Sequence, residues 1–576
     1  MPESSPGFLA PATYRWRLLR RSGRLAGTAL LAAILVACGG SDGDGGSSNA
    51  GGGGGQTPVD LLASFKQQTL SWKTCDASYF DEDYSDADQI AELGERAQCA
   101  LMRVPLDYDN PSSGELQIEV LKVAAEQTSQ KLGAIVLNPG GPGGESLSIA
   151  PEVGLKLADA DPDEAGALLQ EMSRRYDLVA FSARGTGRHS PLHCELSEEQ
   201  LPNESFIVDS SPENVKKIQH NARLLAEACA ANPMSKHVHT DATARDMDLL
   251  RGLLGEEKLN YIGYSYGTWL GTWYAGLFPE RVGRMLLDGS VDAAASFDDA
   301  LLAQIPAQQR IIDELMLPHA ISNPARFGLG NDVTALRNRL IALPARLKLA
   351  LRQYIEPAHP DDFNRSIFAA AAAFGLQDVM ARNPSVGLST IQAEIAASAA
   401  FAIPQVAAQA FPLFLKLTFP EDGRKLSQVD FVYWSVGCNN SGKVGTEQHW
   451  VDVAKDYAER YPLAGDQVVY NPCLYWSGSE KRMPAMAEVS KAGPLLMLHS
   501  QYDAATSIVG ARKMFEALPN ARMVVVEDEY LHQVFPYGTA CVDRQVANYF
   551  LHGQLPERLS SCAGKELGGS DDDEDA

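Results

Sequence analysis

Residues 258–267 read KLNYIGYSYG, and this stretch decides the fold of the chain. Residues 259–263, LNYIG, are predicted to form a strand, and a helix is predicted to begin near Tyr266 without an intervening loop. The junction holds Gly263, Ser265 and Gly267 in the pattern G-x-S-x-G. At a strand–turn–helix junction this pattern places the serine on a sharp, strained turn that exposes its hydroxyl for attack. Three fixed residues would match by chance on the order of 0.2 times in a chain of this size, so the junction carries the prediction.

Strands and helices alternate on both sides of this motif. Short apolar or alternating runs are predicted as strands at 116–123, 134–137, 176–181, 284–287, 494–498 and 522–526. Helices are predicted at 242–254 and 508–518. The alternation favours an α/β fold in which a mainly parallel sheet carries helices on both faces.

A serine nucleophile needs a base, and the base needs a carboxylate to orient it. Asp503 and His532 each follow one of the last two predicted strands. Because the carboxyl ends of parallel strands meet at one edge of a sheet, both side chains are expected beside Ser265. The order Ser, Asp, His along the chain is that of the α/β-hydrolases. His499 competes for the role of base, but it precedes the acid and is expected to be packed at a strand end.

A glycine-rich loop, NPGGPGG at 138–144, follows an early predicted strand. In this fold that position supplies the second donor of an oxyanion hole, so the N–H groups of Gly141 and Tyr266 are the predicted donors. A phosphate-binding loop is one alternative, but G-K-[ST] is absent and Pro142 lacks an N–H. A plain turn is the other. The predicted chemistry is acyl transfer through an acyl-enzyme, and no metal or cofactor is expected.

Residues 293–491 are predicted to be a mainly helical cap inserted into the hydrolase core. Ala-rich segments at 366–376 and 390–402 are typical of helices. The predicted organisation is a signal peptide at 1–37, a tether at 38–58, the N-terminal part of the core at 59–292, the cap at 293–491, the C-terminal part of the core with acid and base at 492–565, and an acidic tail at 566–576.

The first 37 residues resemble a bacterial lipoprotein signal peptide. Five arginines between positions 15 and 24 precede an apolar run at 25–37 that is short for a membrane span. The run ends in Leu-Val-Ala-Cys, which resembles a lipobox, so Cys38 is the predicted lipidation site and membrane anchor. The alternative is an ordinary secretory signal in which Cys38 is incidental. In both cases the folded body is expected to be exported, behind a glycine-rich tether.

The other eight cysteines agree with export, because an even number in an exported protein favours disulfides. On the order of a hundred pairings are possible. Pairing between neighbours along the chain is expected: Cys75–Cys99, Cys194–Cys229, Cys438–Cys473 and Cys541–Cys562.

The composition excludes several classes of protein. In 576 residues, 73 Asp and Glu oppose 49 Lys and Arg, which gives a formal net charge of −24. Nucleic acid is therefore not an expected partner, since phosphate binding needs clustered basic residues. Beyond the N-terminus no apolar run is long enough to cross a membrane.

Several segments together resemble one group of enzymes. The segments are NPGGPGGES (138–146), YDLVAFSARGTGRHSPLHC (176–194), KLNYIGYSYGTWLG (258–271), FPERVGRMLLDGSVD (278–292), ALPNARMVVVEDEYLH (517–532) and CVD (541–543). They look like the secreted tripeptidyl aminopeptidase group, relatives of prolyl iminopeptidase within the α/β-hydrolases. The resemblance runs from about residue 72 to 562 and implies hydrolysis of amide bonds near a free N-terminus. It places nucleophile, acid and base on Ser265, Asp503 and His532.

The resemblance also implies cap carboxylates that bind the substrate's α-ammonium group. In the cap segment YWSVGCNN (433–440), Asn439 and Asn440 stand where an acidic residue is expected, and neutral amides recognise ammonium more weakly. Glu145 follows the glycine loop and is either an alternative carboxylate or a surface residue. These three are the candidate substrate-binding residues.

Three functions follow from this reading. The first is a lipid-anchored serine exopeptidase that acts on short peptides outside the cytoplasm. The second is a carboxylesterase or amidase acting on small extracellular substrates through the same triad, which the two asparagines favour slightly. The third, which the intact triad disfavours, is a catalytically silent lipoprotein that uses the fold for binding.

Overall fold

The structure is a computed structural model and describes residues 60–76, 79, 87–352, 354, 360–418, 426–465, 468–478 and 480–567. The predicted signal peptide, Cys38, the tether and residues 568–576 lie outside the described residues. Within the described part of the chain, no helix has the length and apolar character needed to cross a membrane.

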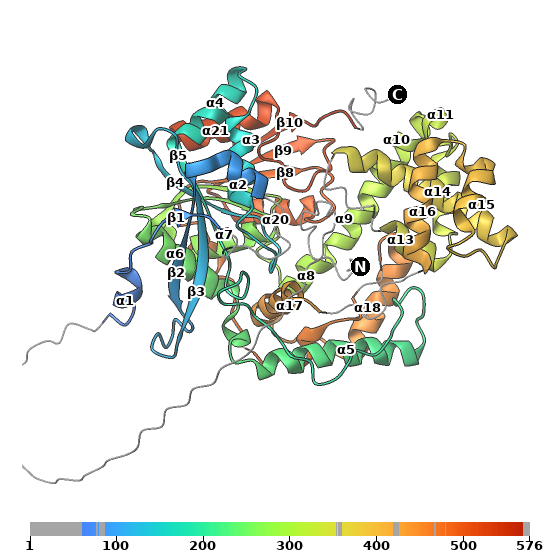
Figure 1. The fold of residues 1–576 in the computed structure, drawn as a ribbon, viewed down its shortest axis with the longest axis horizontal. Helices are drawn as coiled ribbons and strands as arrows, with labels where there is room; N and C mark the ends of the chain where they lie inside the picture. The colour runs from blue at the N-terminus through green and yellow to red at the C-terminus, as the bar shows by residue number, and fades with distance from the viewer. Residues whose placement is uncertain are drawn as a thin grey trace, which may run out of the picture.

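The described residues form a sheet of ten strands (Figure 1). The strands are β1 Lys73–Thr74, β2 Ala97–Pro105, β3 Glu115–Val123, β4 Gly133–Asn138, β5 Tyr176–Phe181, β6 Leu259–Tyr264, β7 Val282–Asp288, β8 Leu495–Ser500, β9 Ala521–Glu527 and β10 Leu559–Ala563. Their order is β1-β2-β3-β5-β4-β6-β7-β8-β9-β10. Pairing is antiparallel from β1 to β5 and parallel across the remaining strands to β10. The predicted mainly parallel sheet is confirmed.

Helices cover both faces of this sheet, and each face has its own apolar core. On one face lie α2 Ala87–Leu93, α3 Ile149–Ala158, α4 Glu164–Arg175 and α21 Ala540–His552. On the other lie α6 Thr240–Leu253, α7 Tyr266–Leu277 and α20 Ile508–Ala517 (Figure 1). Every residue of β4, β5 and β8 is buried, because alternate side chains enter the two cores. The α/β-hydrolase architecture predicted from the sequence therefore has its structural basis in this three-layer packing.

Between β7 and β8 the described chain forms helices and loops. The helices are α8 Phe297–Leu302, α9 Gln304–Ile311, α10 Leu317–Ser322, α11 Pro324–Phe327, α12 Val333–Ile341, α13 Ala345–Arg352, α14 Pro360–Arg382, α15 Ile391–Ala397, α16 Pro404–Thr418, α17 Gln428–Ser441, α18 Glu447–Arg460 and α19 Met486–Val489. Helices α10 to α16 form a lobe to one side of the sheet with its own apolar core (Figure 1). The two Ala-rich segments predicted to be helical lie in α14 and around α15. The limits 293–491 for the cap remain a prediction.

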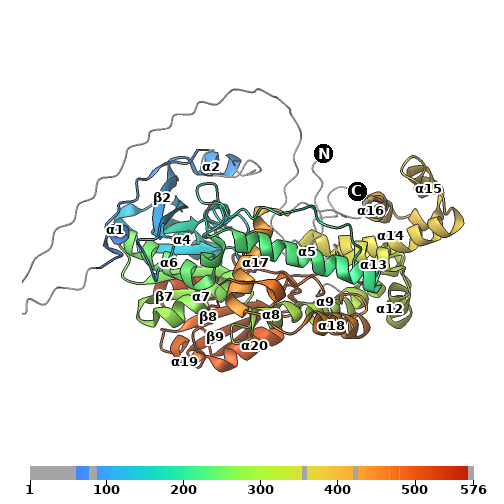
Figure 2. The same cartoon turned by 90° about the horizontal axis from the view of Figure 1, so that it is seen from below.

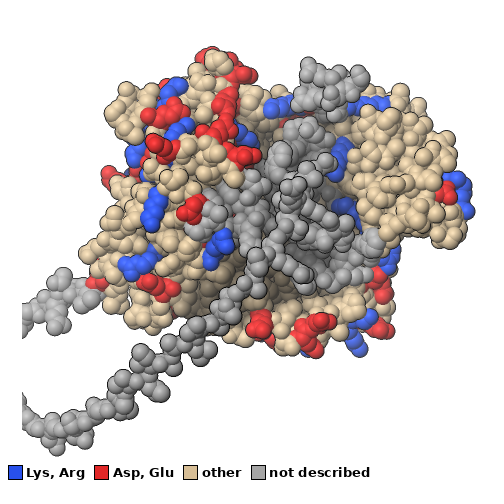
Figure 3. Space-filling view, in the orientation of Figure 1, with Lys and Arg blue, Asp and Glu red and all other residues tan. Residues whose placement is uncertain are grey.

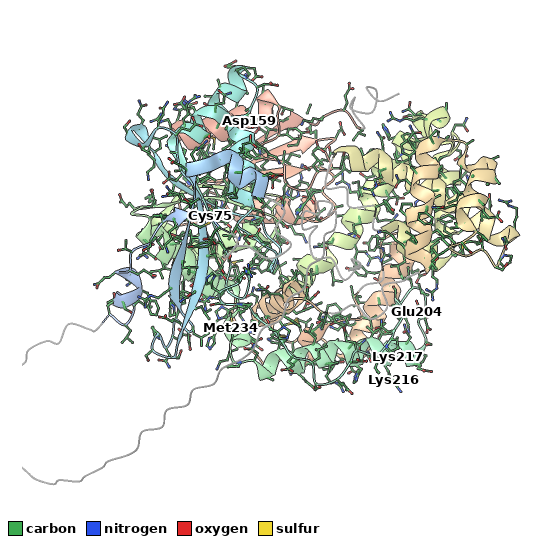
Figure 4. The ribbon with its side chains drawn as sticks, viewed as in Figure 1. Cys75, Asp159, Glu204, Lys216, Lys217 and Met234 are labelled. Atoms are coloured by element: carbon green, nitrogen blue, oxygen red, sulfur yellow. A yellow bond between two sulfur atoms is a disulfide. The ribbon has the colours of Figure 1, made fainter. Side chains whose placement is uncertain are left out.

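Shorter elements complete the fold. They are α1 Ala63–Lys66, α5 Pro212–Ala231, the 3-10 helices Gly94–Arg96, Thr128–Gln130, Ser235–His237, Pro279–Arg281, Ala399–Phe401 and Pro472–Tyr475, and a π-helical turn at Ile312–Met316. Of these, α5 is long and runs along the edge of the molecule that is lowest in Figure 1, toward the lobe formed by α10 to α16 (Figures 1 and 2). Glu204, in the loop before α5, forms an ion pair with Arg346 of α13 and so joins the two parts (Figure 4). Acidic side chains gather along the edge formed by α5 and around α4 (Figure 3).

Four disulfides are present in the described residues, and they pair the cysteines as neighbours along the chain: Cys75–Cys99, Cys194–Cys229, Cys438–Cys473 and Cys541–Cys562. The two cysteines of each disulfide lie 21 to 35 positions apart in the sequence. Cys75 lies beside the antiparallel edge of the sheet, where its bond to Cys99 ties β1's end to β2 (Figure 4). The predicted pairing is confirmed, and disulfides of this kind belong to oxidising compartments outside the cytoplasm.

Candidate active site

Ser265 lies at the junction of β6 and α7 in a strained backbone conformation. Its φ is 56° and its ψ is −126°, values that residues with a Cβ atom rarely adopt. A Cβ atom at Gly263 would lie 2.4 Å from the carbonyl oxygen of Gly267, so only glycine permits this close turn. The turn sets Ser265 at the N-terminus of α7, where the helix dipole favours developing negative charge. The serine is thus held in the geometry of a nucleophile elbow.

The glycine loop after β4 presses against this turn. Gly140 has a φ of 103°, and a Cβ atom there would lie 2.8 Å from the Cβ of Ser265. Its N–H donates to Oδ1 of Asn138 at 3.1 Å. The next amide, that of Gly141, meets no acceptor among the described residues. Gly141 and Tyr266 both line the pocket beside Ser265, which is where donors to an oxyanion would be needed.

Asp503 and His532 form a hydrogen-bonded pair. His532 Nδ1 lies 2.8 Å from Asp503 Oδ2. The other oxygen, Oδ1, accepts the N–H groups of Ala505 and Thr506 at 2.8 and 2.7 Å. Burial acts to raise the pKa of Asp503, but the charge and hydrogen bond of His532 act against it and hold the pKa below its usual value. An ionised, fully bonded carboxylate is able to fix the orientation of the imidazole.

His499, the competing base, is packed at the end of β8. It is fully buried, its Nδ1 accepts the N–H of Ser290 at 2.9 Å, and its Nε2 lies 3.2 Å from the carbonyl oxygen of Thr506. Burial lowers its pKa. Both ring nitrogens are therefore engaged in the scaffold, as the sequence predicted for this histidine.

Asp288, at the end of β7, links the backbone of Ser265 to the loop that carries His532, and it was not singled out from the sequence. Its carbonyl oxygen accepts the N–H of Ser265 at 3.0 Å. Its carboxylate Oδ2 accepts the N–H groups of Val534 and Phe535, just after His532, at 2.9 and 2.7 Å. Burial raises the pKa of Asp288 to about 7, although these two N–H groups act in the opposite direction. In the sequence, the one feature that could have drawn attention to Asp288 is its place directly after the strand predicted at 284–287.

Ser265 opens into a mostly apolar pocket between the sheet and the first helices after β7. The pocket contains about 700 Å³ of empty volume, part of it open to solvent. Its described lining residues are Gly141, Ser265, Tyr266, Trp269, Val291, Asp292, Phe297, Ala300, Leu301, Ala303, Gln304, Tyr433, Ala505, Thr506, Ser507 and Gly510. The lining comes from the turn at Ser265, the segment after β7, the loop after β8 and the helices α7, α8, α9, α17 and α20. A substrate here would therefore meet the sheet core as well as the helices between β7 and β8.

The three residues predicted to bind substrate are engaged elsewhere. Asn439 donates to the carbonyl oxygens of Ser235 and Val238 at 2.9 and 3.0 Å, and its Oδ1 accepts Trp476 Nε1 at 2.8 Å. Asn440 donates to Thr240 Oγ1 at 2.6 Å. Both asparagines are buried and neither is among the described residues that line the pocket. The amide groups therefore connect parts of the scaffold.

Glu145 is likewise not among the described residues of the pocket lining. Its carboxylate accepts the N–H groups of Leu147 and Ser148, immediately before α3 begins at Ile149. These bonds stabilise the end of the glycine loop. Glu145, Asn439 and Asn440 thus each contact backbone or scaffold groups, and their contact with the substrate stays a prediction.

Comparisons with known proteins agree with this geometry. A family model described as alpha/beta hydrolase fold matches residues 133–369, and one described as TAP-like protein matches residues 461–562. Over 493 residues the chain is 27% identical to the tripeptidyl aminopeptidase of Streptomyces lividans, which covers 84% of this chain and 86% of the relative. These matches support a TAP-like α/β-hydrolase. The resemblance inferred from its motifs is confirmed.

Two further relatives of this TAP-like hydrolase come from Mycobacterium tuberculosis. Serine protease Hip1 is 35% identical over 215 residues, which is 36% of this chain and 38% of the relative. Carboxylesterase B is 28% identical over 507 residues, which is 86% of this chain and 90% of the relative. The chain is accordingly a serine hydrolase, and its relatives include both peptidases and an esterase.

Proposed function

We propose that this TAP-like hydrolase is a serine exopeptidase that cleaves short peptides near a free N-terminus. The observation that carries the proposal is the 2.8 Å contact between His532 and Asp503, made at the sheet edge where Ser265 occupies its strained turn. The similarity to a tripeptidyl aminopeptidase over most of the chain supports the peptide substrate.

The proposed mechanism is acyl transfer. His532, oriented by Asp503, accepts the proton of the Ser265 hydroxyl as its oxygen attacks the peptide carbonyl. The N–H groups of Gly141 and Tyr266 hold the oxyanion, and His532 then delivers the proton to the leaving amine. Water, deprotonated by His532, attacks the acyl-enzyme in the same way and releases the peptide acid while the serine regains its proton.

An esterase is the second candidate. It is favoured by the similarity to carboxylesterase B and by the apolar character of the pocket around Ser265. The chemistry of the triad is the same, so the two functions differ in what the pocket recognises. A requirement for a free amino group would separate them.

We also propose that the body is held at a membrane through a lipid on Cys38. The disulfides and the similarity to a tripeptidyl aminopeptidase support an exported protein, and the lipobox-like sequence before Cys38 supports the anchor. Expression of the full chain and of its Cys38→Ser variant, followed by membrane fractionation, tests this. The wild type is expected in the membrane fraction and the variant in the soluble one; equal partition would contradict the anchor.

The experiment that tests the enzymatic proposal uses residues 56–576 and the Ser265→Ala variant. Both are assayed on aminoacyl, dipeptidyl and tripeptidyl p-nitroanilides, on N-acetylated versions of each, and on p-nitrophenyl esters. Ser265-dependent cleavage restricted to anilides with a free N-terminus is expected. Ester cleavage that ignores N-acetylation would favour the esterase, and equal activity of the two proteins would rule out Ser265 as nucleophile.

A further inference from the structure

The pocket beside Ser265 holds a single charged side chain among its described lining residues, that of Asp292. The other polar side chains there are neutral, and much of the remaining wall is aromatic or aliphatic. A lone carboxylate in a largely apolar pocket has lost part of its hydration, and a cationic ligand would compensate that loss. The single negative charge in the pocket therefore favours a positively charged ligand.

Within the described chain, no basic side chain neutralises Asp292. Its Oδ1 accepts the N–H of Ala294 at 3.1 Å, and no Lys, Arg or His forms an ion pair with it. Lys513 influences it electrostatically from a longer range, and Asp299 adds a second negative charge nearby. Asp292 also packs on the first turn of α20, since a Cβ atom at Gly510 would lie 3.0 Å from its Cβ. Burial raises the pKa of Asp292, and the backbone N–H groups of Ala294 and Ala295 act against this rise, as does the N-terminus of α20.

Aromatic rings complete the surroundings of a cation. Trp269 and Phe297 meet edge to face with centroids 6.2 Å apart, and Phe297 meets Tyr433 at 5.8 Å. All three rings line the same pocket as Asp292. Aromatic faces attract ammonium groups, most strongly where water is excluded. Carboxylate and rings together form a site suited to an ammonium ion.

The position of Asp292 is fixed relative to the nucleophile. Its neighbour Val291 donates its N–H to Oγ1 of Thr268 at 3.0 Å, and that hydroxyl donates to the carbonyl oxygen of Ser265 at 2.6 Å. The chain of two hydrogen bonds holds the segment with Asp292 against the first turn of α7. A charge held this firmly can determine which bond of a substrate reaches Ser265.

We propose that Asp292 is the subsite that binds an ammonium group of the substrate. The group is either the α-ammonium of a peptide N-terminus or the side-chain ammonium of a lysine. The proposal rests on the proposed function of this pocket as a peptide site, and it assigns to a core residue the recognition that sequence reasoning placed on Glu145, Asn439 and Asn440. Charge-assisted hydrogen bonds contribute an effect of about ten- to hundredfold in affinity.

The kinetic test compares the wild type, Asp292→Asn and the control Asp299→Asn. Asp299 is an exposed neighbour outside the described pocket lining, so its variant removes an equal charge near the site and leaves every lining side chain in place. The substrates are trialanyl p-nitroanilide, its N-acetyl form and N-acetyl-lysyl p-nitroanilide. For Asp292→Asn, the preference for the ammonium-bearing substrate over the neutral one is expected to fall about ten- to hundredfold, mainly through KM. Asp299→Asn is expected to keep the preference of the wild type.

A binding test separates this proposal from the proposed function. Ser265→Ala and Ser265→Ala/Asp292→Asn proteins are titrated calorimetrically with trialanine, N-acetyl-trialanine amide and Nα-acetyl-lysine amide. Binding of one ammonium ligand to the first protein and its loss in the second support the subsite, even if peptidase activity is absent. The ligand that binds identifies the source of the ammonium group.

Three results would overturn the assignment. One is an Asp292→Asn variant that keeps the wild-type preference for ammonium-bearing ligands in both assays. The second is an equal loss on charged and neutral substrates together with a lowered melting temperature, which would make Asp292 a structural residue of the α20 turn. The third is a wild-type enzyme that cleaves charged and neutral peptides equally well and binds no ammonium-bearing ligand. This result would contradict the ammonium subsite and would leave the serine hydrolase chemistry in place.

Discussion

The N–H of Ser265 donates to the carbonyl oxygen of Asp288 at 3.0 Å. The carboxylate of Asp288 accepts the N–H groups of Val534 and Phe535, just after His532. Between them, a Cβ atom at Gly289 would lie 3.2 Å from Cε1 of His532 and 3.4 Å from Oδ2 of Asp503. The end of β7 is thus the part of the scaffold that Ser265, Asp503 and His532 share. The side chain of Asp288 holds the backbone of the loop that carries His532.

Replacing Asp288 by alanine is expected to lower kcat by at least tenfold. The change leaves the N–H groups of Val534 and Phe535 buried without an acceptor, at a cost of about 1–3 kcal/mol each, and frees the loop that carries His532. Asp288→Asn keeps an acceptor oxygen and is expected to retain most of the activity. The measurement is kcat and KM on the preferred anilide, with far-ultraviolet circular dichroism to check folding. Equal kcat for Asp288→Ala and the wild type would remove the positioning role.

Asp288 also predicts a pH dependence of stability. Its pKa rises from 3.8 to about 7 on folding, mainly through burial. The folded state therefore holds this proton more tightly than the unfolded state, so the stability contributed by Asp288 is present below about pH 4 and is lost as pH rises toward 7, at up to about 1.4 kcal/mol per unit. Asparagine does not titrate. The melting temperature of Asp288→Asn relative to the wild type is expected to increase between pH 5 and pH 8, and a constant difference would contradict the shifted pKa.

The sequence predicted those parts of the fold whose signal is local. Strands β4 to β9 were found because each contains a short, largely apolar run, and the places of Ser265, Asp503 and His532 followed from the ends of β6, β8 and β9. β2 was missed although it lies inside the sheet, since ALMRVP mixes polar and apolar residues without a clear period. β10 was missed because it is short and largely polar, as an edge strand can be.

The residues that sequence reasoning missed depend on contacts over long separations. Asp288 accepts a hydrogen bond from Val534, which lies 246 positions further along the chain, and no sequence pattern near either residue predicts this contact. Asn439 and Asn440 were assigned to the substrate by analogy with a cap motif, whereas their partners in the fold are scaffold groups about 200 residues away. Asp292 lies in the quoted motif FPERVGRMLLDGSVD, but only the structure places it in the pocket.

Gly140 is predicted to be essential for activity. A Cβ atom there would lie 2.6 Å from the carbonyl oxygen of Tyr264 and 2.8 Å from the Cβ of Ser265, and its φ of 103° already disfavours any side chain. Gly140→Ala is therefore expected to displace the nucleophile and reduce kcat/KM by at least a hundredfold, the loss typical of an oxyanion hole or nucleophile out of place by about 1 Å.

The matched control for Gly140 is Gly252, inside α6. A Cβ atom there would meet nothing within 4 Å, so Gly252→Ala is expected to leave kcat/KM unchanged and to stabilise the helix by up to about 1 kcal/mol. Both variants are assayed on the same anilide and melted under the same conditions. Similar activity of the two variants would mean that the glycine loop does not need to approach Ser265 closely.

A buried ion pair between Arg184 and Asp246 is predicted to hold the loop after β5 against α6 and the end of β2. Both side chains have no exposed surface, their closest contact is 2.7 Å, and Tyr108 donates to the same carboxylate at 2.8 Å. Arg184→Met strands a buried carboxylate and is expected to lower the free energy of unfolding by about 3–5 kcal/mol. The double variant Arg184→Met/Asp246→Leu removes both charges and is expected to recover a large part of that loss. Guanidinium unfolding of residues 56–576 measures both.

The control for this pair is the partly exposed ion pair of Arg245 and Asp241, whose contact is 2.8 Å. Arg245→Met is expected to cost less than about 1 kcal/mol, because water screens the charges and solvates the carboxylate left behind. A loss in Arg184→Met no larger than that in Arg245→Met would show that water reaches Asp246 in the folded protein. A double variant less stable than Arg184→Met would mean instead that the remaining bonds of Asp246, chiefly that from Tyr108, stabilise the fold even without the arginine.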